Sequence, residues 1–348
     1  METNNYLNLR GIEFTEFSAK DPSELHRLFT ALGFSKIMKH KEKKIDLYQQ
    51  RQITFLVNYE PNTFGGEFFN SHGPCVSSMG WKVDDADLAL STAVERGAKA
   101  SKKIDYKING KEVPTILGIG DSNIYFIDKY TSATLYEDMG FERLENPQVV
   151  DDLGFEYVDH LTNNVYEGTM KEWSDFYKNV FGFTEVRYFD IRGAKTGLTS
   201  YALQSPDKSF CIPINEGTEK KSQINEYLDE YKGPGVQHIA LHTSNIIDSI
   251  TKMSASNIDT LDIDDQYYEE VFEKLPNVTE DRKKLQDLQI LVDGDEEGYL
   301  LQIFTKNIIG PIFFEIIQRK NHNAFGEGNF GALFRSIERD QEKRGYLK

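Results

Sequence analysis

The chain has 348 residues, which is enough for two domains that each bury a sizeable core. With 39% hydrophobic residues it is expected to fold as a globular protein. Its formal net charge of −16 at pH 7 argues against nucleic acid or an anionic membrane surface as a partner, because both would repel it.

The N-terminal residues Met1–Asn5 lack the basic start and apolar core of a signal peptide. The longest uncharged apolar run, Ile308–Phe314, is too short to span a bilayer. We therefore expect a cytoplasmic protein. Cys75 and Cys211 are too few for a disulfide framework and have no CxxC motif near them, so both are expected to be small core or boundary residues.

Two segments of the first half recur in the second half. A helical pattern over residues 24–34 resembles the pattern over 172–183, and both end near a glycine. Residues 73–83 align without gaps on residues 233–243, with Ser78 where His238 stands. The repeated unit reads as a strand, a helix and several further strands. Four such units, two in each half, predict two similar α+β domains.

The domain boundary is expected where Pro147 and a polar run separate the halves. We predict a first domain over residues 1–145, a linker over 146–153, and a second domain over 154–348 that includes a C-terminal helix. The first domain is interpreted as structural, or as the part that supports assembly into a homo-oligomer, a dimer or a tetramer. The second domain is expected to carry the chemistry.

Three strand-like apolar stretches of the second half each contain one polar side chain, namely His160, His238 and Glu315. An unpaired buried carboxylate would cost several kcal/mol, so Glu315 needs a partner, and a bound cation is one candidate. Two imidazoles and one carboxylate are the ligands of the facial triad of non-haem Fe(II) oxygenases. For any one of these histidines alone, a hydrogen-bonded core residue is the alternative interpretation.

The C-terminal region begins with a glycine-rich segment, residues 324–331, which contains Phe325 and Phe330 and which we call the lid loop. It leads into an amphipathic helix predicted over 332–341. No Lys-Ser/Thr pair follows the glycines, so phosphate binding is not expected. We interpret the segment as a mobile lid over a pocket, and a simple turn before a helix is the alternative. A charged stretch, 262–284, is expected to form a surface helix around 267–275.

Several ordered motifs resemble those of bacterial members of the 4-hydroxyphenylpyruvate dioxygenase family, which has the vicinal oxygen chelate fold. The resemblance covers nearly the whole chain. The matching motifs are Gly197–Ser200, Ile212–Glu216, Ser222–Ile224, Gly235–Ala240, Leu301–Phe304, Phe313–Arg319 and Gly326–Phe330. The resemblance implies an α+β protein with two domains, each of paired βαβββ modules that form an open barrel, and a C-terminal lid helix.

The resemblance also implies roles for individual residues. It makes His160, His238 and Glu315 ligands of Fe(II). The implied catalytic positions are the polar residues Ser200, Asn215, Gln223, Gln237 and Gln302. The implied substrate-binding positions are Phe304, Phe313, Phe325, Asn329 and Phe330. In a regular strand the side chain of Gln237 would point away from that of His238, so a direct contact of Gln237 with substrate is the least expected of these.

The implied reaction converts 4-hydroxyphenylpyruvate and dioxygen to homogentisate and carbon dioxide, a step of tyrosine and phenylalanine catabolism. One alternative is 4-hydroxymandelate synthase, although Pro213-Ile214-Asn215 favours the dioxygenase. A second alternative is a non-catalytic protein of the same fold that binds an aromatic acid. A third is an extradiol ring-cleaving dioxygenase, for which His242 is the one candidate for an additional acid-base group.

Overall fold

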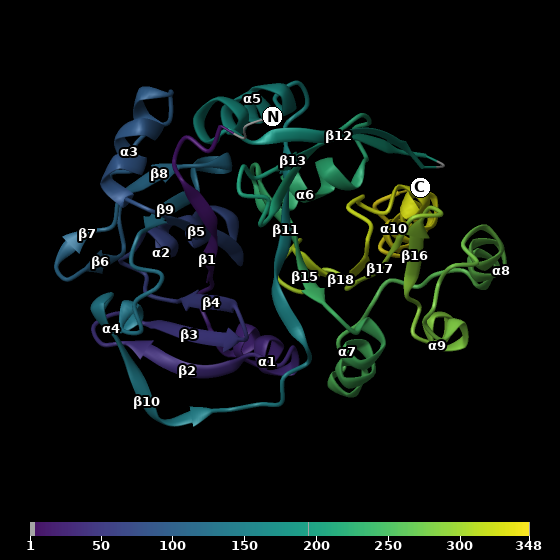
Figure 1. Cartoon of the computed structure of the whole chain (residues 1–348), viewed down its shortest axis with the longest axis horizontal. Coiled ribbons are helices and arrows are strands. Elements are labelled where there is room, and N and C mark those ends of the chain that lie inside the picture. Colours follow the sequence, from purple (N-terminus) through teal and green to yellow (C-terminus); the bar gives the residue numbers. More distant parts are fainter. Residues whose placement is uncertain (1–3, 194, 348) are drawn as a thin grey trace.

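The computed structural model describes residues 4–193 and 195–347. Two eight-stranded sheets stand next to each other, with β1 (Leu9–Ser18) of the first half and β11 (Phe155–Val165) of the second near the middle of the molecule (Figure 1). Several helices, among them α3 (Ala86–Glu95), α7 (Ile246–Met253) and α8 (Asp265–Lys274), lie at the periphery of the molecule (Figure 1). The predicted α+β class is therefore confirmed.

The first sheet has the strand order β10-β2-β3-β4-β1-β5-β9-β8. Its other strands are β2 (Ser35–His40), β3 (Ile45–Gln50), β4 (Ile53–Asn58), β5 (Cys75–Val83), β8 (Thr115–Leu117), β9 (Asn123–Ile127) and β10 (Phe141–Gln148). A separate ribbon pairs β6 (Lys107–Ile108) with β7 (Lys111–Glu112). The helices of this half are α1 (Ser23–Ala31), α2 (Phe64–His72), α3 (Ala86–Glu95), the 3₁₀ helix η1 (Ile119–Asp121) and α4 (Leu135–Asp138).

The second sheet has the order β12-β13-β14-β11-β15-β18-β17-β16. Its other strands are β12 (Thr184–Arg192), β13 (Gly197–Gln204), β14 (Cys211–Gly217), β15 (Gly235–Thr243), β16 (Leu291–Gly294), β17 (Tyr299–Phe304) and β18 (Phe313–Lys320). The helices are α5 (Met170–Phe181), α6 (Gln223–Tyr231), α7 (Ile246–Met253), η2 (Ser254–Ser256), α8 (Asp265–Lys274), α9 (Arg282–Asp287), η3 (Glu327–Asn329) and α10 (Phe330–Lys343).

Two sequence-based predictions about helices can be compared with these bounds. The helix expected around 267–275 is α8, which begins two residues earlier, at Asp265. The helix expected over 332–341 is α10, which begins at Phe330, so the last two residues of the lid loop are already helical. The predicted start was too late because Gly331 was assigned to the loop, although a glycine is tolerated in the first turn of a helix.

The internal repeat is visible in the strand register. Strands β5 and β15 each pair antiparallel with the first strand of their half, and parallel with β9 and β18, respectively. In both halves the antiparallel pair carries three bulges at matching places. The extra residue is Glu13 or Asp159 at the second bulge, and Ser77 or Gln237 at the third. An extra residue in a strand re-aims its side chain relative to its neighbours.

The two halves share one hydrophobic core. Phe314 of β18 lies with its ring centroid 6.4 Å from that of Phe17 and 6.0 Å from that of Phe55, both in the first half. Trp81 packs with its indole against Phe181 at 4.9 Å. Burial of such large rings dominates core energetics, so the halves support each other.

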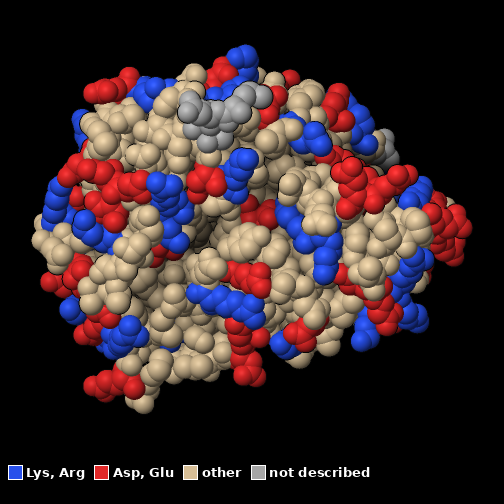
Figure 2. All heavy atoms as spheres, viewed as in Figure 1, with Lys and Arg blue, Asp and Glu red and all other residues tan. Residues whose placement is uncertain are grey.

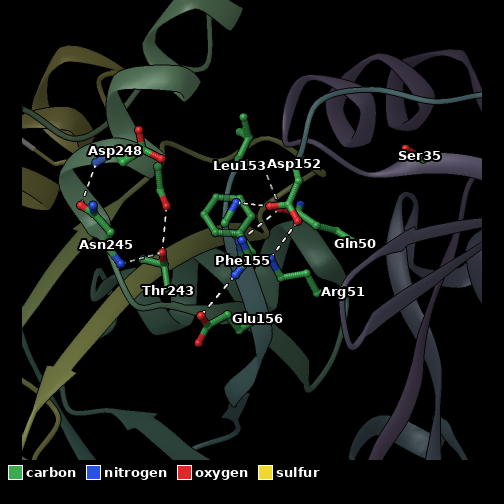
Figure 3. Close-up of polar contacts among 12 residues, drawn as sticks. Ser35, Gln50, Arg51, Asp152, Leu153, Phe155, Glu156, Thr243, Asn245 and Asp248 are labelled. Carbon is green, nitrogen blue, oxygen red and sulfur yellow. Dashed lines mark hydrogen bonds and ion pairs between the residues drawn. The ribbon is translucent and has the colours of Figure 1, made fainter.

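A polar clamp ties the start of β11 to the first sheet (Figure 3). The side-chain oxygen of Gln50 accepts hydrogen bonds from the backbone N–H groups of Leu153 and Phe155, at 3.0 and 3.1 Å. The guanidinium of Arg51 donates to Asp152 at 2.8 Å. Strand β10 continues to Gln148, so the expected linker begins inside a strand. The two-domain division itself stays a prediction.

Figure 2 shows acidic and basic side chains interspersed over one face of the molecule. Among the residues that the structure describes, no helix has the length and apolar character needed to cross a membrane. Cys75 is buried and Cys211 half-buried, and both are free thiols.

Candidate metal centre

Three neighbouring strands of the second sheet bring His160, His238 and Glu315 together. In the strand register His160 of β11 lies opposite Ala240 of β15, and Ala240 lies opposite Glu315 of β18. His238 precedes Ala240 by two residues and therefore faces the same side. The small side chain of Ala240 lies between the two outer ligands. One potential ligand atom from each of the three polar residues lies within 4.8 Å of the others.

One carboxylate oxygen of Glu315 faces both imidazoles. Its Oε2 lies 3.2 Å from Nε2 of His160 and 3.5 Å from Nε2 of His238. The other oxygen, Oε1, accepts a hydrogen bond from the side-chain amide of Gln302 at 3.2 Å. Oε2 is therefore the oxygen that remains to bind a metal ion together with the two Nε2 atoms.

The imidazole of His160 is oriented by an ion pair behind it. Its Nδ1 donates to Oδ1 of Asp159 at 2.8 Å, and Arg319 donates to both oxygens of Asp159 at 2.8 Å each. Asp159 is the extra residue of the β11 bulge, which brings its side chain next to that of His160. A carboxylate on Nδ1 fixes the tautomer in which Nε2 has a free lone pair for a metal.

The imidazole of His238 is oriented in the same way by its own preceding residue. Gln237 is the extra residue of the β15 bulge, and its Oε1 lies 3.1 Å from Nδ1 of His238. The expectation that the two side chains point apart was therefore wrong, since it assumed a regular strand. The ring of Phe313 stacks on the other face of His238, with centroids 4.8 Å apart.

Electrostatics at the site favour negative oxygen atoms beside the imidazoles. Burial alone would raise the pKa of Glu315, but the neighbouring His160 and His238 outweigh it and lower that pKa to about 2. Burial would lower the pKa of His160, but Glu315 and Asp159 raise it to about 9. Burial would raise the pKa of Asp159, but Arg319 holds it far below its usual range.

A cavity of about 90 Å³ lies in front of the three residues. Twelve of the thirteen residues named from the sequence line it, namely His160, His238, Glu315, Ser200, Asn215, Gln223, Gln237, Gln302, Phe304, Phe313, Phe325 and Phe330. The thirteenth, Asn329, belongs to the lid loop and is buried outside the cavity lining, where its amide nitrogen donates to Gln302 at 2.9 Å. Two larger cavities, of about 840 and 500 Å³, contain none of the three candidate metal ligands.

Sequence reasoning missed several residues of this site. Asp159 and Arg319 were given no role, although both are charged residues at strand-like apolar stretches, the same signal that identified Glu315. The apolar wall also includes Phe189 of β12 and the α10 residues Leu333, Phe334 and Ile337. The spacing of the α10 residues places them on one helix face, which could have predicted that this face covers the cavity.

His242 does not lie at the candidate metal centre. Its Nδ1 lies 3.1 Å from a carboxylate oxygen of Glu156, and its ring stacks on Tyr157 at 4.4 Å. It is absent from the cavity lining. The extradiol alternative therefore loses its one candidate acid-base group.

The donor set fits a divalent transition metal. Two neutral imidazole nitrogens and one carboxylate oxygen bind one face of an octahedral ion and leave the other positions open. Here those positions would face a cavity with amide groups and phenyl rings.

Models of two protein families match the chain. The family described as "Hydroxyphenylpyruvate dioxygenase, HPPD, N-terminal" matches residues 3–142. The family described as "Glyoxalase/Bleomycin resistance protein/Dioxygenase superfamily" matches residues 157–281.

Full-length relatives are also similar. Protein MelA of Shewanella colwelliana is 57% identical over 99% of both chains. The 4-hydroxyphenylpyruvate dioxygenase of Legionella pneumophila is 42% identical over 100% of this chain and 99% of its own length. A solved structure, a variant of 4-hydroxymandelate synthase from Streptomyces coelicolor, is 22% identical, covers 96% of this chain and 99% of its own, and has a TM-score of 0.84. The expected vicinal oxygen chelate fold is thereby confirmed.

Proposed function

Because the chain belongs to the 4-hydroxyphenylpyruvate dioxygenase family, we propose that it converts 4-hydroxyphenylpyruvate and dioxygen to homogentisate and carbon dioxide. In this proposal His160, His238 and Glu315 hold an Fe(II) ion. The observation that carries the proposal is the convergence of these three side chains at one end of a cavity whose other walls are amides and phenyl rings.

The amide and hydroxyl groups lie in positions that suit the two ends of the substrate. Ser200 and Asn215 lie opposite each other on β13 and β14, away from Glu315. The amide nitrogen of Asn215 donates to Asn164 at 3.3 Å, which leaves its oxygen free to accept from a phenol. We assign Ser200, Asn215 and Gln223 to the phenol end of the substrate.

Gln302 belongs to the other end of the cavity. Its amide nitrogen bonds to Glu315 and its oxygen accepts from Asn329. Both polar groups of this amide are therefore used by the protein. We assign Gln302, which the resemblance made a catalytic position, to the orientation of the metal-binding carboxylate.

The phenyl rings keep water away from the reacting end of the substrate. Phe313 stacks on His238, and Phe325 lies edge-on to His160 with centroids 5.6 Å apart. Phe330 packs edge-on against Phe189 at 5.3 Å. Exclusion of water protects reactive species from side reactions and strengthens electrostatic interactions in the site.

A bound ferrous ion would supply the positive charge and the redox chemistry that dioxygen activation requires. The chain itself carries a net charge of −16, so an anionic 2-oxo acid needs a local positive charge to bind. The substrate carboxylate would face that charge at the His160 and Glu315 end of the cavity, and its ring would extend towards Asn215.

Dioxygen uptake tests the proposal directly. Metal-free protein is reconstituted with Fe(II), and uptake is followed with and without 4-hydroxyphenylpyruvate, while products are identified by chromatography. We expect uptake only with both present, with homogentisate as the product. A 4-hydroxymandelate product would instead support the synthase alternative, and iron binding without uptake would support a binding protein.

A further inference from the structure

A chain of three hydrogen bonds leads from helix α8 to the candidate metal centre. The hydroxyl of Tyr267 lies 2.5 Å from Oδ1 of Asn329 in the lid loop. The amide nitrogen of Asn329 donates to Gln302 at 2.9 Å, and Gln302 donates to Oε1 of Glu315 at 3.2 Å. Asn329, Gln302 and Glu315 are each at most 3% exposed, so water does not compete for these bonds.

The carboxylate at one end fixes the direction of every bond in this chain. Ionised Glu315 only accepts, so Gln302 must present its N–H group to it and its oxygen to Asn329. Asn329 must then present its own oxygen to Tyr267. The single hydroxyl hydrogen of Tyr267 has two acceptors within reach, Oδ1 of Asn329 at 2.5 Å and the carbonyl oxygen of Val292 at 2.7 Å. Tyr267→Phe would remove this donor, and among the described residues Tyr267 is the one side chain that donates to Oδ1 of Asn329.

The lid loop is shaped to fit this arrangement. Gly326 has a φ of +81°, and a Cβ atom there would come within 1.7 Å of the side-chain oxygen of Gln302. The backbone N–H of Gly328 donates to Asp293 at 3.0 Å. Tyr267 and Asp293 both line the cavity of about 840 Å³ on the outer side of the loop. The loop is therefore held from outside and carries the Gln302 contact on its inner side.

We propose that Tyr267 is a positioning residue, whose hydroxyl holds the lid loop closed and, through Asn329 and Gln302, fixes the Oε1 atom of Glu315. When the lid loop closes, the same hydrogen bonds then orient Glu315 so that its Oε2 atom faces the metal site. The inference rests on the proposed role of Glu315 as a metal ligand.

The adjacent tyrosine provides a matched control. Tyr268 is on the same helix and is 3% exposed, and its hydroxyl is buried without a hydrogen-bond partner. Tyr267→Phe and Tyr268→Phe each remove one hydroxyl oxygen from α8. A loss of α8 packing would affect both variants, whereas the hydrogen-bond chain depends on Tyr267 alone.

The first measurement is hydrogen–deuterium exchange in the metal-free full-length protein. Loss of one hydrogen bond of ordinary net strength should speed exchange in residues 324–331 by about tenfold in Tyr267→Phe. The same segment in Tyr268→Phe should match the unchanged protein. Equal exchange in all three proteins would overturn the inference, and so would faster exchange spread over α8 in both variants. This readout needs neither metal nor substrate, so it stays independent of the proposed reaction.

The second measurement is the affinity for Fe(II), determined by anaerobic titration. Partners behind a metal ligand typically change affinity by about 10-fold or more, so we expect a loss of about that size in Tyr267→Phe. In the double variant Tyr267→Phe/Asn329→Ala the losses should not add, because both changes break the same chain. Fully additive losses would contradict the proposed coupling.

Discussion

The two sheets of this protein carry different side chains on the same backbone plan. Matching register positions are occupied by His160, His238 and Glu315 in the second sheet and by Phe14, Ser78 and Tyr125 in the first. The bulges that orient the two imidazoles also occur in the first sheet, at Glu13 and Ser77. The backbone plan alone therefore does not make a metal centre, and the difference lies in the side chains that it presents.

The corresponding region of the first sheet is filled by aromatic packing. The ring of Phe14 lies 5.7 Å from Tyr106 and 6.0 Å from Tyr125. Gly80 stands where the second sheet has Ala240, and a Cβ atom there would come within 2.4 Å of the Phe14 ring. The first sheet thus uses its interior for stability, while the second leaves a cavity in front of the three candidate metal ligands.

Removal of the carboxylate ligand should abolish metal binding, the property that distinguishes the second sheet from the first. We predict that Glu315→Gln loses bound iron and that its activity falls by more than about 100-fold, since changes behind a ligand alone cost about 10–100-fold. Metal analysis and dioxygen uptake measure both losses. Asn215→Ala, at the phenol end of the cavity and away from Glu315, is the control and should retain iron. Full iron occupancy in Glu315→Gln would contradict the ligand assignment.

Loss of the charge behind His160 should weaken the centre without emptying it. Asp159→Asn removes the ion pair with Arg319 and should lower the affinity for Fe(II) by about 10–100-fold. Metal titration measures the change. Asp84→Asn is the control, because it breaks an exposed aspartate–arginine pair, with Arg10. Equal affinity for Fe(II) in both variants would show that Asp159 does not support the metal centre.

A larger side chain in the core of the first sheet should reduce the stability of the protein and leave its metal content unchanged. Gly80→Ala pushes a methyl group into Phe14, and overpacking of this kind typically costs about 1–3 kcal/mol. Thermal unfolding measures the cost, and metal analysis of the folded protein should be unchanged. Adding Phe14→Leu should recover part of the loss. If Gly80→Ala alone lowered the iron content, the two sheets would not be functionally separate.

The smallest expected effect concerns a buried carboxylate of the first sheet. Glu16 accepts from Asn58 and Ser78, and burial, with help from Asp105, raises its pKa to about 7 from an ordinary value of 4.5. The folded state therefore binds more protons than the unfolded state, and stability contributed by this group is present below pH 4.5 and lost as pH rises through about 7.

Glu16→Gln should make stability depend less on pH across that window. Thermal midpoints between pH 4.5 and 8 measure the dependence, and the variant should gain on the unchanged protein as pH rises. Glu142→Gln, on the more exposed strand β10, is the control. Parallel curves for Glu16→Gln and the unchanged protein would refute the assignment.

Much of the fold and the three candidate ligands could be predicted from the sequence. A polar residue in an apolar strand is informative because burial is costly, which identified His160, His238 and Glu315. The gapless repeat predicted two similar halves. The orientation of Gln237 could not be predicted, because a bulge depends on the pairing of two strands and has no signal in one of them. The chain from Tyr267 to Glu315 was also hidden, since its four residues come from separate elements.

The bulges also limit how the protein can change in length. Each one places a residue and its neighbour side by side in a strand that otherwise alternates between two faces. Deleting Asp159 would remove this bulge and turn over the residues just before it, so that the buried Val158 would change faces. A substitution at position 159 keeps the bulge. A deletion between Phe155 and His160 changes the strand register, so the number of residues between them is constrained.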